Sequence, residues 1–168
     1  MENIILIGMP GAGKSTIGIV LAKILGYEFI DSDLLIQKSE GRLLWEIIEQ
    51  DGLKAFNAIE EKVNSEITVT HAVIAPGGSV VYGPKAMKHL SDIGTVIYLD
   101  VDYDLLEQRV GNLDRRGVVH KVDQTLRHLY DERVPLYKKY ADITIHEDDD
   151  SISATVSLIL EALGIVRD

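Results

Sequence analysis

Residues 8–15 read GMPGAGKS, and this stretch decides the fold. It matches the pattern G-x-x-x-x-G-K-[ST] in full, with a short apolar run at residues 4–7 before it and helical periodicity over residues 14–25 after it. Glycines let the backbone curl so that consecutive N–H groups point at one phosphate, and the start of the next helix adds partial positive charge. The order strand, glycine-rich turn and helix therefore predicts a P-loop that binds a nucleoside triphosphate.

The residue types of the P-loop predict separate roles in nucleotide binding. Lys14 is expected to reach the β- and γ-phosphates, and the Ser15 hydroxyl is expected to ligate Mg²⁺. A glycine-rich turn that binds nothing is the alternative, and the complete match with its flanking elements disfavours it. The predicted nucleotide-binding residues of the loop are Gly11, Ala12, Gly13, Lys14, Ser15 and Thr16.

Apolar periodicity along the rest of the chain predicts strands that alternate with helices. This alternation is typical of an α/β protein, and we expect three α/β/α layers around a five-stranded parallel sheet, the P-loop NTPase fold. Helices are expected at 34–48 with a break near Gly41, around 56–67, at 103–110, at 123–140 with an interruption at Pro135, and at 151–163; the further strands are expected at 28–30, 72–75, 95–99 and 143–145.

Composition limits the class of protein and of partner. The chain has 168 residues, enough for a single domain spanning 1–168, and it has no cysteine for disulfides or thiolate metal sites. A net charge of -10 argues against a surface that tracks nucleic-acid phosphates. No apolar run approaches the roughly 20 residues that cross a bilayer, so we expect a cytoplasmic protein with no membrane partner.

Three further motifs resemble the shikimate kinase family of P-loop proteins, along nearly the whole chain. Residues 31–33 (DSD) resemble that family's D-[ST]-D, and residues 76–79 (PGGS) stand where it carries a glycine triplet. Residues 133–137 (RVPLY), followed by YAD at 140–142, resemble its R-x-P-L-Y…A-D segment. A P-loop alone indicates only nucleotide binding, whereas this ordered combination is much more specific.

The resemblance implies roles for individual residues on the nucleotide side. Asp31 would help to hold Mg²⁺ through water, and Asp33 would accept or orient the acceptor hydroxyl. Arg109 would stack on adenine, and Arg116 would stabilise the transferred phosphoryl group, with Arg115 able to substitute for either. Strand-end caps for the two aspartates and solvated surface positions for the arginines remain the alternatives. The predicted catalytic residues are Lys14, Asp33 and Arg116.

The resemblance also implies a mobile lid at about 111–122 and acceptor-binding helices at about 33–62. Arg133 is expected to face an anionic group of the acceptor. The predicted acceptor-binding residues are Asp33, Asn57, Gly77, Gly78, Ser79 and Arg133.

The departures from the family pattern cluster on the acceptor side. Asn57 stands where the family has the arginine of F-R-x-x-E, and Leu53 stands where it has a glutamate. Ser79 replaces the last glycine of the triplet, and Gly117 replaces a proline of the lid. The acceptor is therefore either not shikimate, or shikimate in a compensated site to which Lys54 contributes charge.

The sequence thus predicts a monomeric, Mg²⁺-dependent kinase that passes the γ-phosphoryl group of ATP to a small hydroxylated metabolite. Shikimate is the first candidate, giving shikimate 3-phosphate and ADP. A gluconate-like sugar acid or a nucleotide as acceptor, and a non-catalytic ATP-binding paralogue, are the alternatives.

Overall fold

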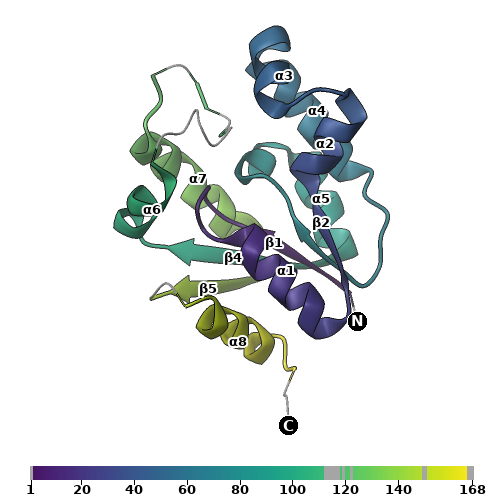
Figure 1. Cartoon of the computed structure of the whole chain (residues 1–168), viewed down its shortest axis with the longest axis vertical. Helices are drawn as coiled ribbons and strands as arrows, with labels where there is room; N and C mark the ends of the chain where they lie inside the picture. The colour runs from purple at the N-terminus through teal and green to yellow at the C-terminus, as the bar shows by residue number, and fades with distance from the viewer. Residues whose placement is uncertain (1, 112–117, 119, 122, 149–150, 166–168) are drawn as a thin grey trace.

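The computed structural model describes residues 2–111, 118, 120–121, 123–148 and 151–165. At its centre lies a five-stranded parallel sheet in the order β2-β3-β1-β4-β5 (Figure 1). The central strand pairs on both sides, with Ile5 opposite Ile74 on one neighbour and opposite Val96 on the other. The strands are β1 (Asn3–Ile7), β2 (Glu28–Asp31), β3 (Ala72–Ala75), β4 (Gly94–Val101) and β5 (Ile143–Glu147).

Helices cover both faces of this sheet, as the sequence predicts. The helices α1 and α8 pack together on one face, and α5 and α7 lie on the other (Figure 1). The helices are α1 (Lys14–Leu25), α2 (Ser32–Glu40), α3 (Leu44–Asp51), α4 (Leu53–Ser65), α5 (Pro84–Ile93), α6 (Tyr103–Val110), α7 (Leu126–Tyr140) and α8 (Ile152–Ala162), with a 3₁₀ helix, η1 (Gly78–Tyr82), after β3.

The core has a large part and a small part. Strands β1 and β3 are buried along their whole length, which explains why they read as continuous apolar runs rather than as alternating ones. A second apolar cluster, formed by Ile36, Ile47 and Phe56, joins α2, α3 and α4 beside the sheet. These three helices therefore form a unit with its own packing, at the top of the molecule in Figure 1.

Several local features differ from the sequence-based expectation. The break predicted near Gly41 is confirmed, because Gly41 ends α2 with a left-handed backbone (φ 64°) and α3 follows it. The remaining features differ. Helix α7 begins at Leu126 and runs through Pro135 without interruption. Pro135 has no backbone N–H to donate to the carbonyl of Asp131, four residues earlier. Both residues are exposed, so water can donate to that carbonyl instead. Helix α5 and η1 were not predicted.

The carboxyl ends of β1, β2 and β3 meet at one edge of the sheet, where parallel α/β proteins bind ligands. The P-loop follows β1, the DSD motif follows β2, and the PGGS motif follows β3. The fold therefore brings the three motifs together. Within the described residues, no helix is long and apolar enough to cross a bilayer.

Candidate active site

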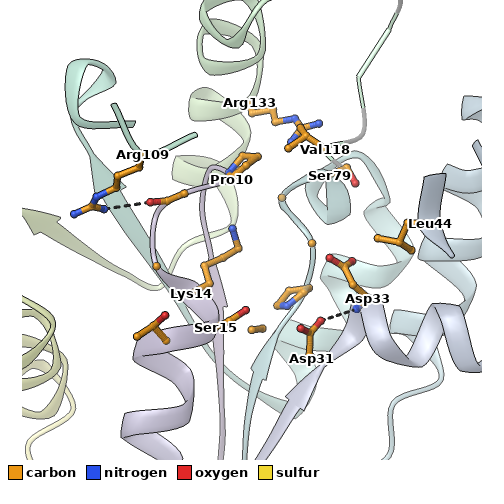
Figure 2. Close-up of a pocket in the computed structure, with 17 residues that line it drawn as sticks. Pro10, Lys14, Ser15, Asp31, Asp33, Leu44, Ser79, Arg109, Val118 and Arg133 are labelled. Atoms are coloured by element: carbon orange, nitrogen blue, oxygen red, sulfur yellow. Dashed lines mark hydrogen bonds between the residues drawn. The ribbon is translucent and has the colours of Figure 1, made fainter. Parts of the chain in front are cut away.

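One cavity of about 530 Å³ opens at this edge of the sheet. Figure 2 shows Lys14 and Ser15 on one side of it, Asp31 and Asp33 on another, and Arg133 above. Leu44 and Val118 also line it, and the sequence had singled out neither as a site residue. The predicted site residues that line the cavity are Gly11, Gly13, Lys14, Ser15, Thr16, Asp31, Asp33, Gly77, Gly78, Ser79, Arg109 and Arg133.

The P-loop takes its shape from glycines in the left-handed region. Gly11 and Gly13 have φ values of 83° and 86°, and a Cβ on Gly11 would lie 2.8 Å from a methyl group of Val110. Lys14 folds over this curve, and its Nζ donates to the carbonyl oxygens of Gly8 (2.8 Å) and Met9 (2.9 Å). An ammonium has three N–H donors, so one remains for a phosphate oxygen.

The electrostatics of Lys14 depend mainly on burial. Burial lowers the pKa of Lys14 to about 8, although the nearby Asp33 carboxylate opposes that shift. Because this ammonium is largely removed from water, its attraction to a phosphate that approaches it is stronger than it would be in bulk solvent.

Ser15 and Asp31 place a hydroxyl and a carboxylate on the walls of the same cavity (Figure 2). Mg²⁺ is usually bound by one or two such oxygen ligands together with phosphate oxygens and water. In the described part of the chain, no group of three or more His, Cys, Asp or Glu side chains is arranged to hold a metal ion by itself. This donor set therefore fits a magnesium ion that enters with a nucleotide.

Asp33 lies across the cavity from Lys14. Burial, followed by the charge of Asp31, raises the pKa of Asp33 to about 6, while Lys14 acts in the opposite direction. The backbone N–H of Asp33 donates to Asp31 Oδ1 at 2.9 Å, so Asp31 also caps α2. Asp31 is therefore a cap, which the sequence analysis gave as the alternative, and it also lines the cavity. Its predicted role toward Mg²⁺ stays a prediction.

The two glycines after β3 allow side chains to approach the backbone closely. A Cβ on Gly77 would lie 2.8 Å from Asp33 Oδ1 and 3.1 Å from Glu60 Oε2. A Cβ on Gly78 would lie 3.0 Å from a guanidinium nitrogen of Arg133. Larger residues here would push these groups out of position.

Arg133 is held firmly where it enters the cavity. It is 1% exposed, its Nε donates to the Tyr82 hydroxyl at 3.2 Å, and its guanidinium lies 5.4 Å from the centre of the Tyr82 ring. The Tyr137 hydroxyl donates to the Gly78 carbonyl at 2.7 Å and fixes the same corner. Helix α7, 15 residues long, thereby ties Arg133 to η1.

The sequence did not identify Glu60 as a site residue, although it lies at the acceptor end. Glu60 is 2% exposed, and the Ser79 hydroxyl lies 2.7 Å and 2.9 Å from its two carboxyl oxygens. Burial raises the pKa of Glu60 to about 8, with the Ser79 hydrogen bond opposing. The spacing along the sequence could have indicated that Glu60 is buried, because Phe56, Glu60 and Asn64 recur every four residues on one face of α4.

Asn57 is absent from the lining of the main cavity, and its predicted contact with the acceptor stays a prediction. It lines an adjoining cavity of about 180 Å³ together with Glu60, Ser79 and Tyr82. Its Oδ1 is buried and has no hydrogen-bond partner among the described residues. Lys54 is exposed and lines neither cavity, so nothing supports its predicted compensating charge.

Arg109 lies at the opposite end of the cavity. One of its terminal nitrogens, Nη1, donates to the Gly11 carbonyl and to Glu147 Oε2, both at 3.2 Å (Figure 2 shows the first). A further cavity of about 200 Å³ lies beside it and is lined by Ala12, Thr16 and Ile152. Arg115, Arg116 and most of the predicted lid at 111–122 lie outside the described residues.

Comparison with known proteins identifies the family. The shikimate kinase family model matches residues 10–164. The shikimate kinase of Histophilus somni is 35% identical, with 99% of this chain and 97% of that protein covered. A shikimate kinase of Legionella pneumophila is 38% identical, with 97% and 95% covered.

Solved structures agree with the sequence comparison. The shikimate kinase of Acinetobacter baumannii in complex with shikimate matches with a TM-score of 0.89 and 33% identity, covering 97% of this chain and 93% of that one. A sugar kinase from a Janibacter species, 12% identical with a TM-score of 0.59, shares the fold alone. The parallel sheet, the P-loop and the matched relatives together show that this chain belongs to the shikimate kinase family of phosphotransferases.

Proposed function

We propose that this chain transfers the γ-phosphoryl group of ATP to a hydroxyl group of shikimate, producing shikimate 3-phosphate and ADP for aromatic amino acid biosynthesis. The observation that carries the proposal is the single cavity in which Lys14 of the P-loop lies across from the buried carboxyl of Asp33. Phosphoryl transfer needs a phosphate cradle and a group that orients the attacking hydroxyl, and these two residues supply them.

The nucleotide enters at the P-loop end. Backbone N–H groups of residues 11–16 and Lys14 hold the β- and γ-phosphates, while Arg109 stacks on the base beside the further cavity. Ser15 would hold the magnesium ion directly, and Asp31 would help to hold it through water. When bound, this ion neutralises charge on the β- and γ-phosphates.

The acceptor enters at the opposite end of the cavity. Asp33 accepts the proton of the attacking hydroxyl, or orients that hydroxyl toward the γ-phosphorus. Arg133 holds an anionic group of the acceptor, and the backbone of Gly77 and Gly78 supports its ring. Arg116 in the lid stabilises charge on the transferred group. The proposal includes a monomeric cytoplasmic protein with no nucleic-acid or membrane partner, a lid at about 111–122, and acceptor helices at about 33–62.

The test is steady-state turnover with shikimate, gluconate and nucleoside monophosphates as acceptors, with the phosphorylated product identified by phosphorus NMR. The proposal predicts saturable, Mg²⁺-dependent phosphorylation of shikimate at about 1–100 s⁻¹, the usual range for kinases. Turnover of gluconate or a nucleotide in its place would assign another acceptor. Tight ATP binding without any turnover would favour the non-catalytic reading.

A further inference from the structure

Arg133 reaches the main cavity from α7, and residues outside that cavity set its orientation. It is 1% exposed, and the proposed function assigns it to an anionic group of the acceptor. A guanidinium is planar and donates hydrogen bonds in its own plane, so it pairs well with an anion only when that plane is turned correctly. A residue that fixes the plane of Arg133 therefore affects how the acceptor binds.

Tyr82 contacts Arg133 at the guanidinium nitrogen nearest to the side-chain stem. Arg133 Nε donates to the Tyr82 hydroxyl at 3.2 Å. At the other end of the guanidinium, Nη1 lies 3.0 Å from the position that a Cβ on Gly78 would take, and Gly78 lines the main cavity. Tyr82 thus holds the inner end of the guanidinium while an outer nitrogen lies beside the cavity wall.

The Tyr82 hydroxyl has a second partner, which determines the direction of its hydrogen bonds. It donates to Glu132 Oε1 at 2.6 Å, and because a phenol has one proton, its oxygen is left to accept from Arg133. Burial, followed by the hydrogen bond to Glu132, raises the pKa of Tyr82, while Arg133 opposes that shift. The phenol therefore keeps its proton at neutral pH, and Arg133, Tyr82 and Glu132 form a directed chain of hydrogen bonds.

The partner that Tyr82 offers to Arg133 is uncharged. A carboxylate in its place would pair with the guanidinium, often through two parallel hydrogen bonds, and would neutralise much of its charge. A phenol oxygen orients the guanidinium and leaves the positive charge for a ligand. The carboxylate of Glu132 lies beyond the phenol at an exposed position, where water weakens its attraction to Arg133.

Tyr137 also lies beside Arg133, but it is part of the core. It is 0% exposed, and its ring stacks on Tyr98 with 5.2 Å between the ring centres. A change at Tyr137 would therefore disturb core packing as well as Arg133. Tyr82 is half-buried, lines the smaller cavity of about 180 Å³ and is absent from the described lining of the main cavity. We therefore expect Tyr82 to act on the acceptor through Arg133 rather than by contact.

We propose that Tyr82 is a positioning residue for the acceptor: its hydroxyl, held by Glu132, turns the Arg133 guanidinium toward the anionic group of the acceptor. The inference rests on the proposed function and makes it more specific, because it assigns part of the acceptor affinity to a residue that does not touch the acceptor. Loss of the hydroxyl should weaken acceptor binding and leave nucleotide binding and the transfer step unchanged.

The experiment is steady-state turnover of full-length wild type and Tyr82→Phe with Mg²⁺, ATP and shikimate. The KM for shikimate should rise about three- to tenfold, the size expected for one lost hydrogen bond. Both kcat and the KM for ATP should stay within about twofold of wild type. Tyr27→Phe removes the same group near the amino end of β2 and should change none of the three constants.

The outcomes separate the inference from the proposed function. An unchanged KM for shikimate in Tyr82→Phe, with active wild type, would overturn the inference and leave the proposed function intact. A fall in kcat without a rise in that KM would also overturn it, because the hydroxyl would then act on the transfer step. Absence of shikimate turnover by wild type would overturn both.

A double-mutant cycle distinguishes positioning from a merely structural role. Arg133→Lys keeps the positive charge but has no planar guanidinium for Tyr82 to orient. In that background, Tyr82→Phe should change the KM for shikimate by less than about twofold. A rise of the same factor in both backgrounds would show that the hydroxyl acts independently of Arg133, and would overturn the inference.

Glu132→Ala tests the chain while Tyr82 stays in place. It removes the group that holds the phenol proton, so the KM for shikimate should be about two- to fivefold higher than in Asp131→Ala. Asp131→Ala is the matched control, because it removes an exposed carboxylate from the neighbouring position of α7. Added to Tyr82→Phe, Glu132→Ala should have less than about a twofold effect, since both act through one hydroxyl. Equal KM values in Glu132→Ala and Asp131→Ala would contradict the inference.

Discussion

The two ends of the cavity are built in different ways. At the nucleotide end, the shape of the site is determined mainly by backbone conformation. Gly11 and Gly13 allow the P-loop to curve, and Lys14 donates to two carbonyl oxygens of the same loop. At the acceptor end, side chains from α4, α7 and η1 meet. Helix α4 also packs with α2 and α3 through a small apolar cluster that is separate from the main core, whereas α7 and η1 belong to the main core. Backbone geometry tolerates few substitutions, whereas a site made of side chains can change its chemistry one residue at a time.

The largest expected effect is at Asp33, where the two ends meet. Asp33→Asn keeps the shape and removes the base, so kcat should fall roughly 10²–10⁴-fold while ATP still binds. The pKa of about 6 adds a pH dependence: wild-type kcat/KM should decline below about pH 6, as the carboxyl becomes protonated.

The measurement for Asp33 is a pH–rate profile of wild type and variant from pH 5 to 8. Asp92→Asn, an exposed change on α5, is the control. A flat wild-type profile, or a variant with near-normal kcat, would remove Asp33 from the chemistry.

Lys14→Ala should be the next most severe change. It removes the ammonium that we propose binds the phosphates, and a loss of roughly 10²–10³-fold in kcat is expected, as for other lost charge-stabilising donors. Lys23→Ala on the exposed side of the same helix is the matched control. Stopped-flow turnover together with thermal unfolding would show whether the loss is chemical. Unchanged turnover would rule out the phosphate cradle.

The raised pKa of Glu60, at the acceptor end, predicts that the free energy of unfolding depends on pH. Its pKa is raised from 4.5 to about 8, so folding favours the protonated form. Its contribution to stability is therefore fully present below about pH 4.5 and is lost as the pH rises through about 8. In Glu60→Gln the side chain cannot ionise, so the free energy of unfolding should decline less between about pH 4.5 and 8 than it does in wild type. The difference should be on the order of a few kcal/mol.

Urea unfolding of wild type and Glu60→Gln between pH 4.5 and 9 measures that difference. Glu66→Gln, an exposed change at the end of α4, should follow the wild-type curve. Parallel curves for wild type and Glu60→Gln would show that folding does not raise the pKa of Glu60.

Arg109 should give the smallest effect. Arg109→Ala removes the cation that we propose stacks on the base, and cation–π contacts at exposed sites contribute about 0.5–1 kcal/mol. The KM for ATP should rise roughly two- to fivefold with little change in kcat. Arg127→Ala, which removes an exposed arginine from α7, should change neither. A large fall in kcat for Arg109→Ala would show that Arg109 acts on the transferred phosphoryl group instead.

The difference between the two ends of the cavity also explains which parts of the site could be predicted from the sequence. The P-loop and the strand-end aspartates were predictable because each is a local pattern at the end of a short predicted strand. The family resemblance and the five-stranded parallel sheet were confirmed. Helix α5 was missed, although Pro84 at its start is a recognised signal for the first turn.

The acceptor end was harder to predict because its contacts join residues far apart in the chain. Ser79 meets Glu60, 19 residues away, and Arg133 meets Tyr82, 51 residues away. No local pattern encodes either contact, and the sequence could show only that Asn57 and Ser79 depart from the family. Whether those departures matter depends on the cavity wall that they form together.

Binding of a non-hydrolysable ATP analogue with Mg²⁺, measured by calorimetry, tests the separation of the two ends most directly. We expect wild type and Ser79→Ala to bind it with dissociation constants within about twofold, and Lys14→Ala to bind it at least tenfold more weakly. If wild type gives no heat, or if Ser79→Ala weakens nucleotide binding as much as Lys14→Ala does, the account is contradicted.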